Sequence, residues 1–165
     1  MRGVASSPHP ALLVEVVVSA TRLSAHEADV SVVRRLLGLF DQAALANANP
    51  ELPLHVGDWV STSEGKVLME ADENVITATL RLEVWDRSIP ADSGWPRTKT
   101  VLMELPSGNL AVDENEYGTR PLDFQLPRPG RWEARLSWRT ENVQHASILV
   151  QFWPAAGSEQ GRRRT

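Results

Sequence analysis

The sequence contains no cysteine among its 165 residues, which excludes disulfide bonds and thiolate metal sites. Its 4 histidines stand singly, without the spacing of a metal-binding motif; they are His9, His26, His55 and His145. No Gly-x-Ser-x-Gly nucleophile motif and no glycine-rich phosphate loop occurs. We therefore predict a non-catalytic chain without a metal ion or cofactor, and the lack of cysteine favours a reducing cytoplasm.

Long hydrophobic runs are scarce as well, and none reaches the length of a membrane span. The run from Ala11 to Ala20 has the length of a signal-peptide core, but Glu15 interrupts it and only Arg2 precedes it. Its β-branched residues follow the period of two that is typical of a strand. We therefore interpret the run as a first strand and predict a cytoplasmic protein without a membrane segment.

Basic residues are outnumbered by acidic ones. The chain has 17 Lys and Arg against 21 Asp and Glu, for a formal net charge of -4. Three of the arginines, at positions 162–164, lie in a polar C-terminal stretch, and setting them aside leaves 14 basic against 21 acidic residues. An acidic body repels the backbone of nucleic acids and favours a basic partner. The predicted partner is therefore a basic protein rather than a nucleic acid.

The clearest structural pattern lies between Leu122 and Trp138, where two stretches alternate apolar and polar residues. Pro127, Pro129 and Gly130 separate the stretches, and proline cannot donate a hydrogen bond to a strand ladder. This pattern predicts two strands joined at an antiparallel corner, with one apolar face and one solvated face.

Other alternating stretches predict further short strands at residues 12–19, 66–71, 76–85, 98–105, 110–112 and 147–153. In the strand from Ile76 to Trp85, Ile76 and every second residue after it are expected to point inward. The Pro-Ser-Gly-Asn sequence at residues 106–109 predicts a β-hairpin between its flanking strands. Residues 50–65, 86–97 and 113–118 are predicted to be loops.

Residues 24–47 carry a different signal. Ser24 and Glu27 have the spacing of a capping box, in which each side chain can bond the backbone N–H of the other residue. Apolar residues then recur at steps of three and four, and the pattern stops before Pro50. The sequence therefore predicts an α-helix from Ser24 to Asn47.

Together these elements predict a mainly β fold, an antiparallel β-sandwich with one α-helix in its N-terminal half, with a closed barrel as the alternative. The sandwich domain is expected to span residues 11–154, between a disordered leader at residues 1–10 and a disordered tail at residues 155–165. Its predicted core contains Val16, Phe40, Leu80, Leu82, Phe124, Leu136 and Val150, together with Trp132, Trp138 and Trp153.

Tryptophan dominates the aromatic residues, with 6 tryptophans against 3 phenylalanines and 1 tyrosine. Trp85 points to the solvated face by strand parity and Trp95 lies in a predicted loop, so both rings are expected to be exposed. Exposed planar rings are typical of modules that bind carbohydrates or other small ligands by stacking. Such a module is the alternative to a protein-binding domain.

The predicted partner-binding surface joins these two rings to nearby acidic residues, and it comprises Trp85, Asp86, Trp95, Asp113, Glu114 and Glu116. Aromatic anchors beside carboxylates favour both interface hot spots and electrostatic steering. The alternative is that Trp95 folds under its own prolines and that the acidic residues only keep the protein soluble. Residues 113–117 also lack the downstream acid of a calcium loop, so no metal site is predicted there.

Four segments between Gly65 and Trp138 resemble the competence protein J family. They are GKVLMEA (residues 65–71), the strand ending at Trp85, RTKTVLMEL (residues 97–105) and RPLDFQLPRPGRWEARLSW (residues 120–138). The resemblance implies a small β-sandwich that acts as an intracellular inhibitor of a DNA-entry nuclease. Two features depart from the family pattern: the long predicted helix and the insert SIPADSGWP (residues 88–96). No functional residue is carried over from the family individually.

Overall fold

The computed structural model describes residues 18–51 and 58–157. The predicted leader, most of the predicted tail, the core residue Val16 and most of the predicted first strand lie outside these ranges. Residues 18 and 19, the end of that predicted strand, are described and are not part of a strand.

Ten strands and two single turns of 3-10 helix make up the described part of the chain. The strands are β1 (Arg22–Ser31), β2 (Leu36–Asp41), β3 (Val60–Ser63), β4 (Lys66–Glu70), β5 (Thr77–Trp85), β6 (Arg97–Leu105), β7 (Asn109–Asp113), β8 (Thr119–Gln125), β9 (Gly130–Asn142) and β10 (His145–Pro154); the 3-10 turns are η1 (Gln42–Ala44) and η2 (Asn115–Tyr117). The predicted mainly β fold is confirmed.

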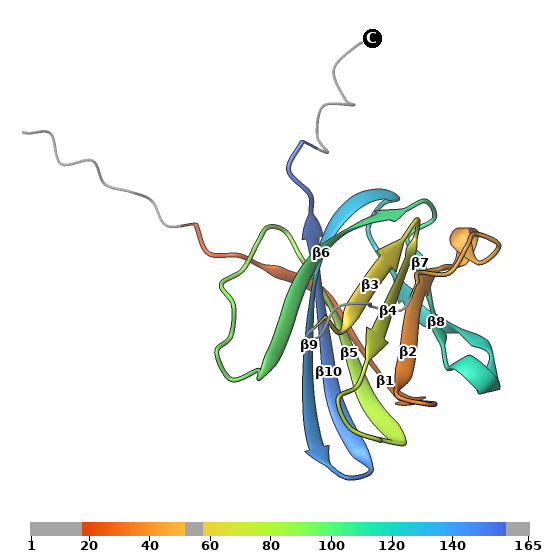
Figure 1. Cartoon of the computed structure of the whole chain (residues 1–165). Coiled ribbons are helices and arrows are strands. Elements are labelled where there is room, and N and C mark those ends of the chain that lie inside the picture. Colours follow the sequence, from red (N-terminus) through yellow and green to blue (C-terminus); the bar gives the residue numbers. More distant parts are fainter. Residues whose placement is uncertain (1–17, 52–57, 158–165) are drawn as a thin grey trace, which may run out of the picture.

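The strands form two five-stranded sheets (Figure 1). The first sheet has the order β1-β5-β10-β9-β6, and the second has the order β3-β4-β2-β7-β8. All neighbouring strands are antiparallel except β5 and β10, which run parallel. Each sheet keeps two edge strands, so the fold is not the closed barrel that was the alternative.

The predicted α-helix from Ser24 to Asn47 is wrong. These residues form β1, β2 and η1, and no α-helix occurs in the described ranges. The apolar residues of this segment fit the period of two as well, since Val30, Leu37 and Leu39 all enter the core from strands. Long-range pairing decides between the two readings, because β1 gains a ladder with β5 that an isolated helix would lack.

A tight turn between β1 and β2 explains why the strand pair was missed. Val33 and Leu36 exchange backbone hydrogen bonds across Arg34 and Arg35, whose φ angles are 52° and 66°. Two consecutive positive φ angles characterise the type I′ hairpin turn, which normally selects Asn-Gly. The Arg-Arg pair carries no such sequence signal.

Residues of both sheets share one hydrophobic core cluster. The predicted core residues Leu80, Leu82, Leu136 and Val150 are fully buried in it, and Phe124, Trp132 and Trp138 belong to it as well. Trp59, from the segment between η1 and β3, packs edge-on against Trp138 with ring centroids 6.4 Å apart. Two predicted core residues, Phe40 and Trp153, are buried but lie outside this cluster. They cover the outer faces of the second and first sheets, respectively.

The chain changes sheets where the sequence predicted strand pairs. β6 pairs with β9 in the first sheet while β7 pairs with β2 and β8 in the second, so the predicted hairpin at residues 106–109 is wrong. The predicted antiparallel corner between Leu122 and Trp138 is likewise wrong, because β8 and β9 belong to different sheets. Both turns let the apolar faces of their flanking strands meet in one core.

The buried Asp41 holds the first of these crossings in place. Its carboxylate accepts hydrogen bonds from the backbone N–H groups of Ser107 (3.0 Å) and Gly108 (2.8 Å) and from the Ser107 hydroxyl (2.7 Å). A carboxylate without exposed surface needs such donors to offset its desolvation. The end of β2 therefore fixes where the chain passes from β6 to β7.

Two smaller expectations are also corrected. The predicted loop over residues 50–65 contains β3, a short edge strand paired with β4. Ile76 was expected to point inward, but it precedes β5 and is 60% exposed. The inward side of β5 begins at Ala78 and continues with Leu80, Leu82 and Val84, as the alternation predicted.

Candidate functional site

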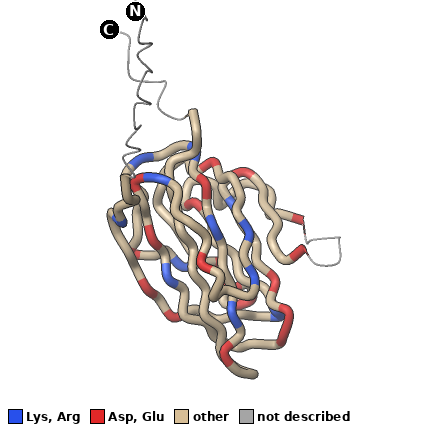
Figure 2. Tube along the Cα trace, turned by 90° about the vertical axis from the view of Figure 1, so that its left-hand side faces the viewer, with Lys and Arg blue, Asp and Glu red and all other residues tan. Residues whose placement is uncertain are grey.

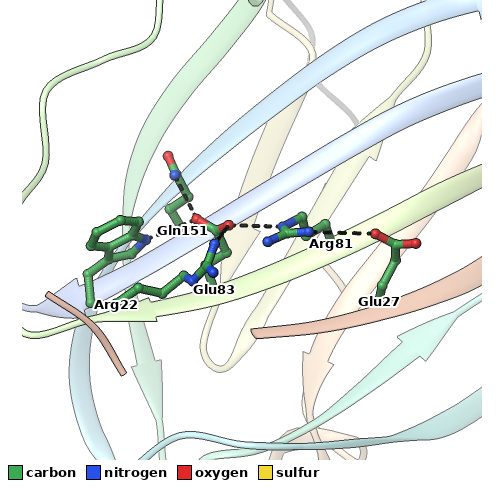
Figure 3. A network of polar contacts seen from close by, with 6 residues as sticks. Arg22, Glu27, Arg81, Glu83 and Gln151 are labelled. Carbon is green, nitrogen blue, oxygen red and sulfur yellow. Dashed lines mark hydrogen bonds and ion pairs between the residues drawn. The ribbon is translucent and has the colours of Figure 1, made fainter. Parts of the chain in front are cut away.

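The outer face of the first sheet carries a network of polar contacts around Glu83 (Figure 3). Only 6% of this side chain is exposed. One carboxylate oxygen accepts hydrogen bonds from Arg81 (2.9 Å) and Arg22 (3.1 Å), and the other accepts from Gln151 and from the Trp85 indole N–H (both 3.0 Å). The predicted partner-binding residue Trp85 is thus a half-buried donor inside an internal network.

The charge of Glu83 is maintained by its donors. Burial by itself would raise the pKa of Glu83, but the hydrogen bonds from Gln151, Arg81 and Trp85 outweigh burial and lower the pKa below its ordinary value. Arg81 also pairs with Glu27 on β1 at 3.8 Å. The network therefore joins the edge strand β1 to the interior strands β5 and β10.

Asp86 follows directly after β5 and anchors the chain that leads into β1. Its carboxylate accepts the backbone N–H of Thr21 at 2.8 Å and a hydrogen bond from Arg87 at 3.0 Å. These donors lower the pKa of Asp86, with the Thr21 N–H making the largest contribution. Asp86 therefore has a positioning role within the fold.

The loop between β5 and β6 crosses the outer face of the same sheet. Arg135 on β9 donates to the backbone carbonyls of Ile89 (2.6 Å) and Pro90 (2.9 Å). The Arg139 guanidinium lies 4.8 Å from the centre of the Trp95 ring, which is half-buried. An intramolecular cation–π contact therefore engages the Trp95 ring.

Trp153 completes this pattern on β10. Its indole N–H donates to Glu133 at 2.6 Å, and the guanidinium of Arg135 lies 5.0 Å from its ring centre. Three tryptophans thus lie on one sheet face, and each is held by a charged side chain of the same chain.

The structure does not bring the six predicted site residues together. Trp85 pairs with Arg22 at one end of β1, whereas Ser31 at the other end donates its backbone N–H to Glu114. At about 3.3 Å per residue, this nine-residue separation places Trp85 roughly 30 Å from the acidic loop. Three groups result: Trp85 with Asp86, Trp95 alone, and Asp113 with Glu114 and Glu116.

Trp85 and Trp95 are also far apart from each other. Trp95 contacts Arg139, which is level with Ser147 on β10 and, through it, with Thr79 on β5. Thr79 lies six residues from Trp85, or about 20 Å along the strand. The two rings therefore do not form a single stacking platform.

Within the acidic loop, two of the three predicted carboxylates form ion pairs with arginines of the same chain. Glu114, 9% exposed, accepts the Ser31 backbone N–H at 2.7 Å and contacts Arg120 at 3.4 Å. Glu116 pairs with Arg34. Asp113 differs, because its carboxylate accepts only a long hydrogen bond from the Thr119 hydroxyl at 3.4 Å, and no ion pair joins it to a cation of the described ranges.

A pocket of about 200 Å³ opens beside Asp113 on the outer face of the second sheet. Its lining includes Leu36, Gly38, Phe40, Pro50, Leu68 and Asp113. In the strand register, Gly38 on the central strand β2 lies between Leu68 on β4 and Asp113 on β7. The pocket therefore lies where the row of outward side chains reaches a glycine on the central strand.

Glycine is required at position 38 for a steric reason, because the Phe40 ring occupies the space where a Cβ atom would lie. A Cβ atom at this position would lie 2.7 Å from the Phe40 ring and 3.0 Å from the Asp113 Cβ. A glycine inside a strand pattern often marks a close approach to another group. This signal was present in the sequence LLGLFD, but the helix prediction concealed it.

The buried Lys66 holds one wall of the pocket in place. Its ammonium donates to the carbonyls of Leu45 (3.1 Å) and Asn47 (2.7 Å) and to the Asn49 side chain (2.8 Å), and lies 4.8 Å from the centre of the Phe40 ring. The segment that follows η1 is therefore fixed over the end of β2, next to Pro50. Sequence reasoning did not identify Lys66, because a lone lysine in a strand normally faces solvent.

The charged side chains are spread over the described part of the chain (Figure 2). Within residues 18–51 and 58–157, no three His, Asp or Glu side chains gather closely enough to hold a metal ion. Acidic and basic residues are interspersed along the trace rather than separated into opposite regions (Figure 2). Across the same residues, no helix is long and apolar enough to span a bilayer.

Comparison with known proteins identifies similar structures but no similar sequence. No protein-family model matches the chain, and no curated protein matches it. The solved structure of ComJ from Bacillus subtilis, an inhibitor of the DNA-degrading activity of NucA, aligns with a TM-score of 0.60 at 12% identity, covering 84% of this chain and all of ComJ. The protein of crocagin biosynthetic gene J aligns with a TM-score of 0.44 at 17% identity, covering 83% of this chain and 99% of that one.

The ComJ alignment confirms the resemblance to the competence protein J family at the level of the fold. It covers 84% of this chain and so extends well beyond the stretch from Gly65 to Trp138 that carried the resemblance in the sequence. The predicted helix, which departed from the family pattern, is absent from the described residues.

Proposed function

We propose that the two sheets form a β-sandwich scaffold for a non-catalytic, cytoplasmic protein that binds and inhibits a DNA-degrading nuclease. The observation that carries the proposal is the alignment with ComJ, which spans the whole of that inhibitor and 84% of this chain. The two proteins share a fold at 12% identity, so the nuclease recognised by this chain is expected to differ from NucA in its surface details.

Charge supports a basic protein as the partner. The formal net charge of the chain is -4, and a partner of opposite charge would be steered toward it at low ionic strength. Asp113 also offers a carboxylate that no cation of the described residues neutralises. Acidic character alone does not select a nuclease, and the fold supplies that part of the proposal.

The alternative of a sugar-binding module receives less support from the geometry. Stacking platforms need exposed rings that one ligand can reach together. Trp85 and Trp95 are half-buried, lie about 20 Å apart along the sheet and each contact an internal charged side chain. We therefore expect oligosaccharides to leave the tryptophan emission unchanged.

The test is a DNA-degradation assay with the purified chain titrated against NucA and against other basic, sequence-independent nucleases. We expect one of these enzymes to lose activity as the chain approaches stoichiometric amounts, and the apparent affinity to fall as salt increases. Preincubation of the chain with DNA alone is the control, since a DNA-binding protein would protect the substrate itself. Undiminished cleavage by every nuclease at excess chain would contradict the proposal.

A further inference from the structure

We propose that the pocket beside Gly38 receives a single lysine or arginine side chain of a protein partner, with its cationic end at Asp113. The inference rests on the proposed function, which supplies the premise that the partner is a protein. It assigns a contact to a face of the molecule where the predicted tryptophans are absent.

The size of the pocket selects a side chain rather than a separate ligand. Pockets for small molecules and cofactors usually hold about 300–1,000 Å³, whereas this one holds about 200 Å³. A single long side chain from a partner fits such a volume. Anchors of this kind, seated in well-packed pockets, supply most of the energy of many interfaces.

The walls of the pocket select a side chain with an apolar stem. Leu36 and Phe40 border the pocket along β2, Leu68 borders it from β4, and Pro50 borders it from the segment after η1. Asn49 and Asn115 add two polar side chains to this lining. The stems of lysine and arginine bury readily against such surfaces while their charged ends reach a polar rim.

The charges around the pocket set the orientation of this side chain. Asp113 lies on β7, on one side of Gly38, whereas the Lys66 ammonium lies toward β4 and over the Phe40 ring. The strands β4 and β7 are two spacings apart, or about 10 Å. The cationic end of the occupant must therefore face Asp113 and turn away from Lys66.

An uncharged occupant would leave the Asp113 carboxylate without a hydrogen-bond donor from the partner, whereas a cation would supply one. A partner docked on this face would remove water from the Asp113 carboxylate, whose hydrogen bond from the Thr119 hydroxyl is long at 3.4 Å. Covering a carboxylate without a matching donor is unfavourable, and a lysine or arginine supplies both the donor and the charge.

The pocket can be tested directly with capped single amino acids. Backbone amide NMR spectra would follow a titration with N-acetyl-lysine-N-methylamide, with the matching arginine probe, and with the norleucine probe, which keeps a stem of similar length without the charge. We expect both cationic probes to shift the amide signals of Gly38 and Asp113, and norleucine to bind about threefold to tenfold more weakly. Equal binding of norleucine, or shifts spread over the surface, would overturn the inference.

Two variants sharpen this test. Asp113→Asn should abolish the preference for the cationic probes, whereas Asp123→Asn makes the same change in net charge at an exposed position on the neighbouring β8 and should keep it. Gly38→Ala should weaken all three probes, because its Cβ atom would displace the Phe40 ring that lines the pocket. If the alanine variant fails to fold, the pair of asparagine variants still decides the outcome.

The nuclease assay separates this inference from the proposed function. Probe binding together with a loss of inhibition in Asp113→Asn, but not in Asp123→Asn, would support both. Probe binding by a chain that inhibits no nuclease would retain the pocket and reject the function. Full inhibition by Asp113→Asn would reject the pocket as the docking site and leave the function standing.

Discussion

The outer faces of the two sheets differ in what their polar groups contact. On the first sheet, Glu83, Trp85, Trp95 and Trp153 all have charged or hydrogen-bonding partners within the chain. On the second sheet, a pocket opens beside Gly38, and Asp113 in its lining forms no ion pair with a cation of the described residues. Tryptophans and acidic residues can therefore form a binding surface only where other side chains of the same chain do not already contact them.

The same difference explains why the predicted site divides. Trp85 and Asp86 look like interface residues because of their composition and parity, but Glu83 on the same strand and the Thr21 backbone N–H just before β1 already contact them. Asp113 was predicted on the weaker ground of a charged loop. It borders the pocket of about 200 Å³ on the second sheet, whereas Asp86 borders a wider pocket of about 360 Å³ beside Trp153.

The strongest test of the comparison is Trp153→Ala on the first sheet. The ring is 5% exposed and holds contacts with Glu133 and Arg135. Truncation should lower the free energy of unfolding by about 3–5 kcal/mol, measured by urea denaturation. Tyr117→Ala is the control, because Tyr117 is 76% exposed on η2 and its loss should change stability by less than about 0.5 kcal/mol. Similar losses of unfolding free energy in both variants would refute a specific structural role for Trp153 on the first sheet.

Replacing Glu83 by glutamine should have the next largest effect. The Glu83 carboxylate forms hydrogen bonds with charged partners, and a hydrogen bond to a charged group contributes about 1.5–3 kcal/mol to stability. We therefore expect the free energy of unfolding at neutral pH to fall by an amount of that order. Asp113→Asn should be close to neutral in stability, within about 0.5 kcal/mol. Equal losses would show that the two carboxylates are equally integrated into the fold.

The effect of Glu83→Gln should also depend on pH. The pKa of Glu83 is lowered in the folded protein, so the stabilisation is complete above the unfolded pKa, about 4.3, and is lost as the pH falls through the folded pKa. The difference in unfolding free energy between wild type and Glu83→Gln should therefore narrow below that pH. A difference that stays constant down to pH 3 would contradict the assigned role of the charge.

Lys66→Met tests whether the wall of the pocket depends on the buried ammonium. Methionine keeps most of the stem but leaves the carbonyls of Leu45 and Asn47 without their donor. We expect the free energy of unfolding, measured by thermal denaturation, to fall by about 1–2 kcal/mol. The capped lysine probe should also bind more weakly. Lys99→Met is the control, since Lys99 forms a partly exposed pair with Asp58 and should change stability by less than about 1 kcal/mol.

The smallest effect is expected from Arg34→Gly in the turn between β1 and β2. A positive φ of 52° is strained for arginine and unstrained for glycine, while the exposed pair with Glu116 contributes little. We expect a gain of up to about 1 kcal/mol in unfolding free energy. A clear loss of stability would show that the contact with Glu116 matters more than the backbone strain.

The sequence by itself determined the inward-facing residues of several strands, among them β5, β9 and β10. The alternation in β5, β9 and β10 identifies Leu82, Leu136 and Val150 as core residues because a pleated strand sends successive side chains to opposite faces. It also revealed the resemblance to competence protein J through four strand-and-turn segments. Local chemistry suffices for these features, since each depends on residues adjacent in the chain.

Only the tertiary structure decided which strands pair and which polar groups have partners. The segment after Ser24 fits both a helical and a strand period, and pairing of β1 with β5 selects the strand. The turns at residues 106–109 and 127–130 look like hairpins, yet a shared core sends their flanking strands to different sheets. The same holds for the site: Glu83 and Trp85 are close in sequence, but Gly38, Leu68 and Asp113 become neighbours only through the register of three strands.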